Sequence, residues 1–143
     1  MTLSLLLGAC GPAATAVAPA TEAPAEEKIL KLGLEGPFTG GNARVGEEFL
    51  DAATMAFDKV NWQIGDSKVE IVKIENESER ATRAYEEAIV RDGIQVGLIN
   101  WHSSVAVALM EVAANHKIPH FFGFGATGLV YKKYLSVPEK YSH

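Results

Sequence analysis

Short apolar runs alternate with amphipathic stretches from residue 28 to about residue 122. Four runs are mostly apolar and are bounded by turn-forming residues, a pattern typical of buried parallel strands. They cover residues 29–34, 69–74, 94–99 and 118–122. We therefore predict four strands, with a stretch of different periodicity between each strand and the next.

The stretches between the strands have helical spacing. After the first strand, apolar residues recur every three to four positions with charged residues between them, which predicts a helix of about 17 residues. Its predicted buried positions are Val45, Phe49, Ala52, Ala53, Ala56 and Val60. A second helix is predicted between a cap at Ser78 and a stop at Gly93, and a third from a cap at Ser103 or Ser104 to Ala113.

The alternation of strands and helices indicates the fold class. A helical crossover between parallel strands is right-handed, and the resulting sheet is covered on both faces. The sequence therefore predicts an α/β fold, a doubly wound parallel sheet in three layers. Ligands of such sheets bind beyond the carboxyl ends of the strands, where the strand order reverses. The residues just after each strand are thus the candidates for function.

Three strand exits carry groups suited to a small zwitterion. These exits are residues 36–46, 100–104 and 123–128. Ser103 and Ser104 offer hydroxyls at a helix N-terminus, where the dipole favours a carboxylate; helix capping is the alternative, above all for Ser104. Gly125 lets the backbone approach a ligand and Thr127 adds a hydroxyl, with an ordinary turn as the alternative. The remaining exit, residues 75–78, is predicted to be a solvated edge.

Composition and charge exclude several classes of function. The 143 residues carry a formal net charge of −5 and no basic stripe, which argues against nucleic acid. No His or carboxylate spacing suggests a metal, and no G-x-S-x-G elbow suggests a hydrolase. Residues 123–128 match G-x-G-x-x-G, but the dinucleotide fingerprint belongs after the first strand. We expect a binding protein without a cofactor, and a dinucleotide-binding oxidoreductase is a remote alternative.

The N-terminal residues have a different character. The only cysteine, Cys10, ends a short apolar run and precedes an Ala-, Pro- and Glu-rich stretch. This arrangement resembles the signal and lipidation site of bacterial lipoproteins, which implies cleavage before Cys10 and a lipid on its thiol; a chance apolar N-terminus is the alternative. The run lacks a preceding Lys or Arg, which suggests an incomplete signal. We predict a signal at 1–9, a lipidated flexible linker at 10–27 and a ligand-binding domain at 28–143.

The domain from residue 28 to about residue 141 resembles the N-terminal lobe of the branched-chain amino-acid-binding proteins. The resemblance is carried by residues 36–40, Gly46, residues 92–93, 103–104 and 125–127, in this order and spacing. Members of that family are extracytoplasmic receptors of ABC importers, in which two α/β lobes close on an amino acid. The resemblance implies the same fold, a membrane permease as partner and no enzymatic activity.

The resemblance also implies roles for single residues. Ser103 would meet the ligand carboxylate, Thr127 both the carboxylate and the ammonium group, and the Gly125 carbonyl the ammonium group. Phe38 lies in the matching motif, and Val45 stands where the family often places an aromatic residue that covers the ligand.

The largest departure from the family pattern is at Trp101 and His102. Smaller residues are expected there in the family, so this pair could narrow or polarise the pocket. Trp101 could stack on a ligand or pack on the sheet edge, and both alternatives stay open. His102 is interpreted as a polar residue at the pocket rim.

The resemblance leaves ligand and context open. Leucine-type amino acids are the default ligand, with urea, short amides, polar amino acids and aromatic acids as alternatives. A ligand-sensing domain of a receptor or regulator is the alternative function. The chain matches only the first lobe, so we interpret it as a truncated product. By itself it should bind amino acids weakly or not at all, because the second lobe should supply the opposite wall of the cleft.

Overall fold

A computed structural model describes residues 27–76, 79–98, 101–123 and 127–142. Several sequence predictions fall on residues outside these ranges. They are the signal at 1–9, Cys10, almost all of the linker at 10–27, the Ser78 cap and Gly125.

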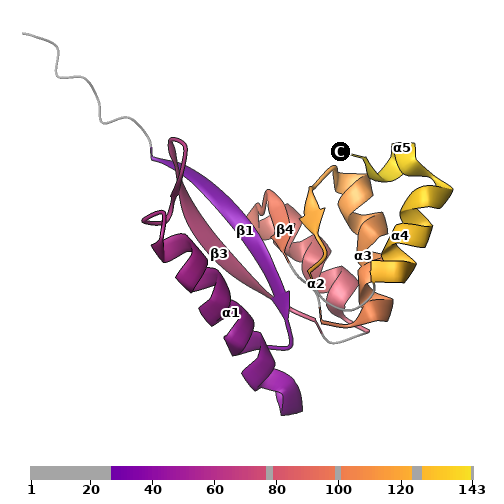
Figure 1. Cartoon of the computed structure of the whole chain (residues 1–143), viewed down its shortest axis with the longest axis horizontal. Coiled ribbons are helices and arrows are strands. Elements are labelled where there is room, and N and C mark those ends of the chain that lie inside the picture. Colours follow the sequence, from indigo (N-terminus) through magenta and orange to yellow (C-terminus); the bar gives the residue numbers. More distant parts are fainter. Residues whose placement is uncertain (1–26, 77–78, 99–100, 124–126, 143) are drawn as a thin grey trace, which may run out of the picture.

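The described strands form one five-stranded sheet (Figure 1). They are β1 (Lys28–Gly36), β2 (Gln63–Ile64), β3 (Ser67–Glu75), β4 (Val96–Leu98) and β5 (His120–Phe121). The order across the sheet is β2-β3-β1-β4-β5, and every neighbouring pair is parallel except β2 with β3. The four predicted strands are confirmed as β1, β3, β4 and β5. The short hairpin that adds β2 was not predicted.

Helices cover both faces of this sheet, which confirms the doubly wound α/β fold. A Cβ atom at Gly36 would point at Phe49 of α1 (Ala43–Asp58), whereas one at Gly33 would point at Ile74 and Ile94 on the opposite face. That opposite face packs against α2 (Ala81–Glu87) and α3 (Ser103–His116). Figure 1 shows α1 on one side of β1 and β3 and the later helices on the other.

The core lies between the sheet and the pair α2 and α3. Its largest fully buried apolar side chains include Leu109 and Tyr85, of which none of the surface is exposed. The buried members of this cluster are Ile74, Ala81, Tyr85, Ala88, Ile94, Val105, Leu109 and Ala113. This face therefore supplies most of the hydrophobic burial that stabilises the described fold.

The buried stripe of α1 differs from the predicted one. The half-buried residues on the helix are Ala43, Val45, Phe49, Leu50, Ala53, Thr54 and Phe57. Ala52, Ala56 and Val60 are exposed, so their predicted burial is wrong. The stripe follows the i, i+4 row from Phe49 to Phe57, and α1 ends at Asp58, before Val60.

The ends of α2 and α3 test two capping predictions. The chain leaves α2 through a π-helical turn (Ala88–Asp92) and stops at Gly93, which adopts the left-handed conformation at φ 72° and confirms the predicted stop. At the start of α3, the N-cap is His102, whose carbonyl accepts a hydrogen bond from the Ala106 N–H at 3.0 Å. Among the described residues no side chain caps this helix, which begins at Ser103 itself, so the predicted serine cap is wrong.

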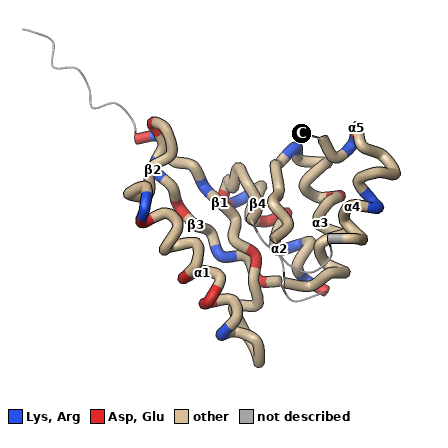
Figure 2. The backbone as a smooth tube through the Cα atoms, in the orientation of Figure 1, with Lys and Arg blue, Asp and Glu red and all other residues tan. Residues whose placement is uncertain are grey.

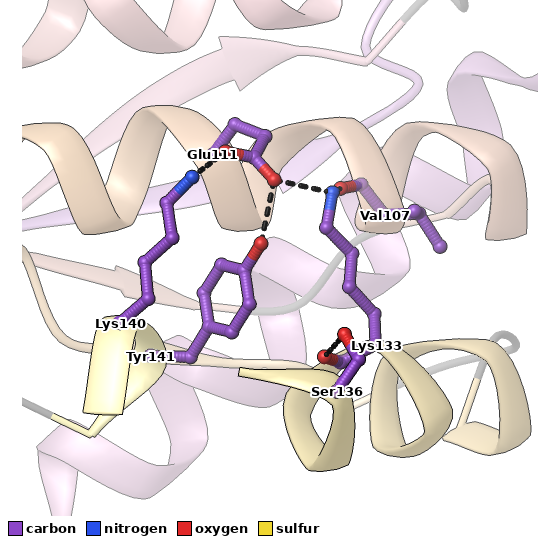
Figure 3. A network of polar contacts seen from close by, with 6 residues as sticks. All are labelled: Val107, Glu111, Lys133, Ser136, Lys140 and Tyr141. Atoms are coloured by element: carbon purple, nitrogen blue, oxygen red, sulfur yellow. Dashed lines mark hydrogen bonds and ion pairs between the residues drawn. The ribbon is translucent and has the colours of Figure 1, made fainter. Parts of the chain in front are cut away.

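Two further helices, α4 (Thr127–Ser136) and α5 (Pro138–Tyr141), follow β5 and pack along α3. Figure 3 shows Lys133, Lys140 and Tyr141 converging on Glu111 of α3. The Lys133 ammonium lies 2.7 Å from Glu111 Oε1, the Tyr141 hydroxyl donates to the same oxygen at 2.6 Å, and Lys140 pairs with Oε2. These donors lower the pKa of Glu111 to about 2.

None of the helices in the described ranges has the length and apolar character needed to cross a bilayer.

Candidate functional site

The strand order places a crevice at the carboxyl edge of the sheet. From β1 the chain crosses to β3 on one side, and from β3 it passes over to β4 on the other side of β1. The order therefore reverses between β1 and β4, and the segments that follow these two strands diverge around a gap. These segments are residues 37–42, which include the short 3₁₀ helix η1 (Gly40–Asn42), and the residues that lead into α3.

The segment after β1 is fixed to helix α1 by Gly46. A Cβ atom at this position would lie 2.6 Å from the carbonyl oxygen of Pro37, closer than any side chain can approach. Gly46 is also the one residue of α1 that is fully buried. Glycine is therefore required here because the helix and the loop touch through their backbones.

A cavity of about 420 Å³ opens at this edge of the sheet. Polar side chains and loop backbone line it: Pro37, Thr39, Gly40, Gly41, Asn42, Asn76, Glu79, Arg80 and His102. The lining residues come from the segments after β1, β3 and β4, as expected for a site at the carboxyl ends of parallel strands. The cavity therefore combines a cation, a carboxylate, an amide and an imidazole in one polar space.

Asn76 and Glu35 form the buried floor of this region. Neither residue exposes any of its surface, and Asn76 Nδ2 donates a hydrogen bond to Glu35 Oε2 at 2.9 Å. Asn76 Oδ1 and Glu35 Oε1 have no hydrogen-bond partner among the described residues. Burial raises the pKa of Glu35 well above the ordinary value of a glutamic acid, and the Asn76 hydrogen bond only partly offsets this effect.

The predicted solvated edge after β3 is wrong at Glu75 and Asn76, the two described residues of the segment 75–78. Asn76 is fully buried, and both carboxylate oxygens of Glu75 are buried without a partner among the described residues. The reason is the long-range pairing of β3: Glu75 lies beside Gly36 in the sheet, and the Asn76 N–H donates to the Gly36 carbonyl at 3.0 Å. The exit of β3 is therefore packed against the exit of β1.

A second polar pair, of the buried Tyr85 and the half-buried His120, lies on the same face of the sheet. The Tyr85 hydroxyl is 2.9 Å from His120 Nδ1, and the His120 ring stacks on Phe122 with centroids 4.3 Å apart. The pair sits over Gly97 of β4, where a Cβ atom would lie 2.2 Å from His120 Nδ1. Burial and the nearby Glu35 carboxylate raise the pKa of Tyr85.

The two predicted serines face different surroundings. Ser103 is the exposed first residue of α3, directly after the cavity-lining His102. Ser104 instead lines a separate groove between α3 and α4, together with Lys132 and Lys133. Thr127 is the first residue of α4, whose preceding strand β5 ends at the same edge of the sheet as β4.

The predicted aromatic and aliphatic contacts lie on the α1 side of the sheet. Trp101 packs against Phe49 of α1 with ring centroids 6.1 Å apart, so this contact is with a helix and not with the sheet edge. Stacking of Trp101 on a ligand stays a prediction. The Phe38 ring lies under the Lys73 ammonium at 5.0 Å from its centroid, which anchors the loop after β1. Val45 is half-buried in the first turn of α1. None of these three residues lines the 420 Å³ cavity.

The lining of the described cavity consists of polar side chains and loop backbone that can form hydrogen bonds to a small molecule. Within the ranges that the structure describes, no three His, Cys, Asp or Glu residues are grouped as a metal would require. Figure 2 shows acidic and basic residues interspersed along the described chain. The cavity can therefore hold a small polar molecule by hydrogen bonds and by the single cation and single carboxylate at its wall.

Sequence reasoning missed Asn76, Glu79 and Arg80 as cavity residues. One usable signal was present: they follow a strand at the functional edge of the sheet, as the other three candidate segments do. That signal requires knowing that β3 is the neighbour of β1, which the local pattern does not reveal.

Comparison with known proteins places this geometry in a family. A family model described as periplasmic binding protein matches residues 29–138. No curated protein matches the chain.

Solved structures share the fold. A solute-binding protein of an ABC transporter from Rhodopseudomonas palustris, in complex with 3,4-dihydroxybenzoic acid, is 24% identical with a TM-score of 0.68, over 75% of this chain and 30% of that protein. Another from R. palustris, in complex with benzoate, is 28% identical with a TM-score of 0.59, over 64% and 26%. A branched-chain amino-acid-transporter protein from Streptococcus pneumoniae, in complex with isoleucine, is 20% identical with a TM-score of 0.56, over 65% and 28%.

The chain spans at most 30% of the length of these three solved proteins. They are solute-binding components of ABC transporters, a binding role that agrees with the chemistry of the cavity. The family match covers most of the described strands and helices, including every residue that lines the cavity. The chain therefore belongs to the periplasmic binding protein family.

Proposed function

We propose that the protein is an extracytoplasmic solute-binding component of an ABC importer, which delivers a small amino acid or a related carboxylate or amide to a membrane permease. Membership of the periplasmic binding protein family implies the extracytoplasmic location. The observation that carries the proposal is the polar cavity at the carboxyl edge of the sheet, beside the point where the strand order reverses.

The first turns of two helices are proposed to bind the solute carboxylate. Ser103 and Thr127 begin α3 and α4, which follow adjacent parallel strands, so both helix N-termini lie at the same edge of the sheet. Unpaired N–H groups and the helix dipole favour an anion at such a position. The Gly125 carbonyl is proposed to accept a hydrogen bond from an ammonium group where the solute carries one.

Calorimetry on the full-length protein with branched-chain amino acids, polar amino acids, short amides and aromatic acids tests this proposal. We expect one of these classes to bind, and Ser103→Ala to weaken that binding about tenfold, as loss of a hydrogen bond to a charged group would. Ser142→Ala is the matched control, since Ser142 is an exposed serine whose hydroxyl bonds to Tyr134 of α4 and Pro138 of α5. Absence of binding across the whole panel would overturn the proposal.

Anchoring through Cys10 is proposed as well. A receptor that hands its solute to a permease gains from being tethered near the membrane, because the tether raises its local concentration. Mass spectrometry of the mature protein should find cleavage just before Cys10 and a lipid on its thiol. A mature protein that starts elsewhere, or a free thiol at Cys10, contradicts the anchor but leaves the solute-binding proposal in place.

A further inference from the structure

We propose that Asn76, held in position by Glu35, determines the specificity of the cleft: it accepts a hydrogen bond from a hydroxyl or carboxamide at the end of the solute opposite its carboxylate. This inference rests on the proposed function and narrows its solute class. It selects elongated molecules with polar groups at both ends over molecules that end in an apolar group.

The first support is an unsatisfied acceptor in the cavity wall. Asn76 lines the cavity, exposes none of its surface to solvent in the described fold, and leaves Oδ1 without a partner among the described residues. A buried polar atom without a hydrogen bond is destabilising by about 1–3 kcal/mol, so such atoms are few in native proteins. A bound solute that donates to Oδ1 would remove this penalty.

The second support is the way in which Glu35 fixes the amide. Asn76 Nδ2 donates to Glu35 Oε2 at 2.9 Å, and both side chains are completely buried. Nδ2 and Oδ1 are attached to the same planar carbon, so a bond that holds the nitrogen also sets the direction of the oxygen. Glu35 does not line the cavity, and it acts as a positioning residue.

The third support is a hydrogen-bond donor, Arg80, in the lining of the same cavity. Arg80 lines the same cavity and supplies only donors, whereas Asn76 Oδ1 supplies an acceptor. A hydroxyl or a carboxamide can donate to the asparagine and accept from the arginine at the same time. An ammonium group lacks the acceptor, and a methyl group lacks both.

The sheet geometry sets the length of the solute. Asn76 follows β3, and Ser103 follows β4, with β1 between these strands. Strands in a sheet lie about 4.8 Å apart, so the carboxyl ends of β3 and β4 are separated by roughly 10 Å along this edge. A solute whose carboxylate lies at Ser103, next to the cavity-lining His102, would extend along this edge towards Asn76.

Matched pairs of ligands test this inference by calorimetry on the full-length protein. The pairs are 4-hydroxybenzoate with benzoate, and glutamine with leucine; within each pair, the head group is the same and the far end is polar or apolar. In whichever pair binds, we expect the polar member to bind at least tenfold more tightly. Leaving the buried amide unpaired opposite an apolar end is the reason for this difference.

Variants test whether Asn76 and Glu35 cause the difference in affinity within a ligand pair. Asn76→Leu should bring the affinity ratio within the pair to one or below, whereas Asn115→Leu, an exposed asparagine on α3, should leave it unchanged. Glu35→Gln keeps a neutral acceptor for Nδ2 and should keep the ratio, while Glu35→Leu should reduce it. If Glu35 had a merely structural role, Glu35→Leu would weaken the binding of both ligands of the pair equally and leave the affinity ratio constant.

The outcomes separate the two proposals. If no ligand of either pair or of the wider panel binds, the proposed function fails. If a pair binds with equal affinity in the wild-type protein, or if the ratio survives Asn76→Leu, the proposed function stands and this inference is overturned. The wild-type ratio requires no variant, so the test remains decisive even if Asn76→Leu does not fold.

Discussion

Glu35 combines complete burial with the absence of any basic partner among the described residues. Its side chain faces Asn76 and, across the core, the Tyr85 hydroxyl, which is itself bonded to His120. The carboxyl group is therefore held in its protonated form over a wider pH range than an exposed glutamate.

The raised pKa of Glu35 predicts a pH-dependent stability. Because the folded state holds this proton more tightly than the unfolded state, its contribution to stability is complete below the ordinary pKa and is lost as pH rises through the folded-state pKa. Glu35→Gln removes this loss, so the variant should gain about 1–3 kcal/mol over the wild type between pH 4 and pH 8. Urea unfolding at pH 4 and at pH 8 measures the difference in free energy of unfolding between Glu35→Gln and the wild type. A difference that is the same at both pH values contradicts the prediction.

Gly97 gives a residue-scale prediction about packing. A Cβ atom there would lie 2.2 Å from His120 Nδ1 and 2.4 Å from the Tyr85 hydroxyl, inside the core of the described fold. Gly97→Ala should therefore lower the free energy of unfolding by about 1–3 kcal/mol. Gly128→Ala is the control: in α4 its Cβ meets no atom within 4 Å, and it should be neutral or slightly stabilising. Equal unfolding midpoints for the two variants would show that a side chain at position 97 does not clash with His120 and Tyr85.

Among the elements, α3, α4 and α5 are joined by the Glu111 cluster. Two lysines and a tyrosine from the two later helices meet one carboxylate of α3. Lys133 also donates to the Val107 carbonyl at 2.9 Å, which adds a backbone contact between α3 and α4. The cluster therefore holds the last two described helices in place by polar contacts at a surface where few apolar groups are buried.

The lowered pKa of Glu111 predicts the opposite pH dependence to that of Glu35. The contribution of Glu111 to the stability of the folded state is present above the ordinary pKa of a glutamate and is lost as pH falls towards about 2. The Glu111 side chain is 39% exposed, so solvent screening limits the effect to about 0.5 kcal/mol or less. Hydrogen exchange of α4 and α5 should be faster in Glu111→Gln at pH 7, and equal to that of the wild type near pH 2. Unchanged exchange at pH 7 would show that the cluster does not hold these helices.

Element prediction from the sequence succeeded where the signal was local. The runs at 29–34 and 69–74 became β1 and β3, and Gly93 ended its helix because only local backbone conformation was needed. The phase of α1 and the environment of residues 75–76 were wrong because each depends on a contact with a distant segment. In the site, His102 followed from its position after a strand, whereas buried Asn76 has the same sequence appearance as a solvated asparagine.

The described molecule as a whole leaves apolar side chains exposed beside its outermost parallel strand. Phe121 of β5 is 65% exposed and Tyr131 of α4 is 61% exposed. A separate cavity of about 420 Å³, lined mainly by apolar side chains, lies between α3, β5 and α4. Exposed strand edges with apolar side chains favour pairing between chains.

Self-association of the 143-residue chain is the prediction at this scale. Phe121→Lys should lower the apparent molar mass in sedimentation at high concentration, because a charged residue on an edge strand opposes edge-to-edge pairing. Val90→Lys is the matched control, since Val90 is 72% exposed but lies in the turn that follows α2. Equal association of both variants would show that the β5 edge plays no part.

The backbone contact between Gly46 and Pro37 has a consequence for the kinetics of solute capture. It makes the loop after β1 and the start of α1 move as one piece, so this wall of the cavity is already ordered before any solute arrives. The entropy of ordering the wall is then lost during folding and does not weaken the affinity. Encounter with the solute should accordingly proceed in one step on this side of the cleft, without a slow rearrangement of the loop after docking.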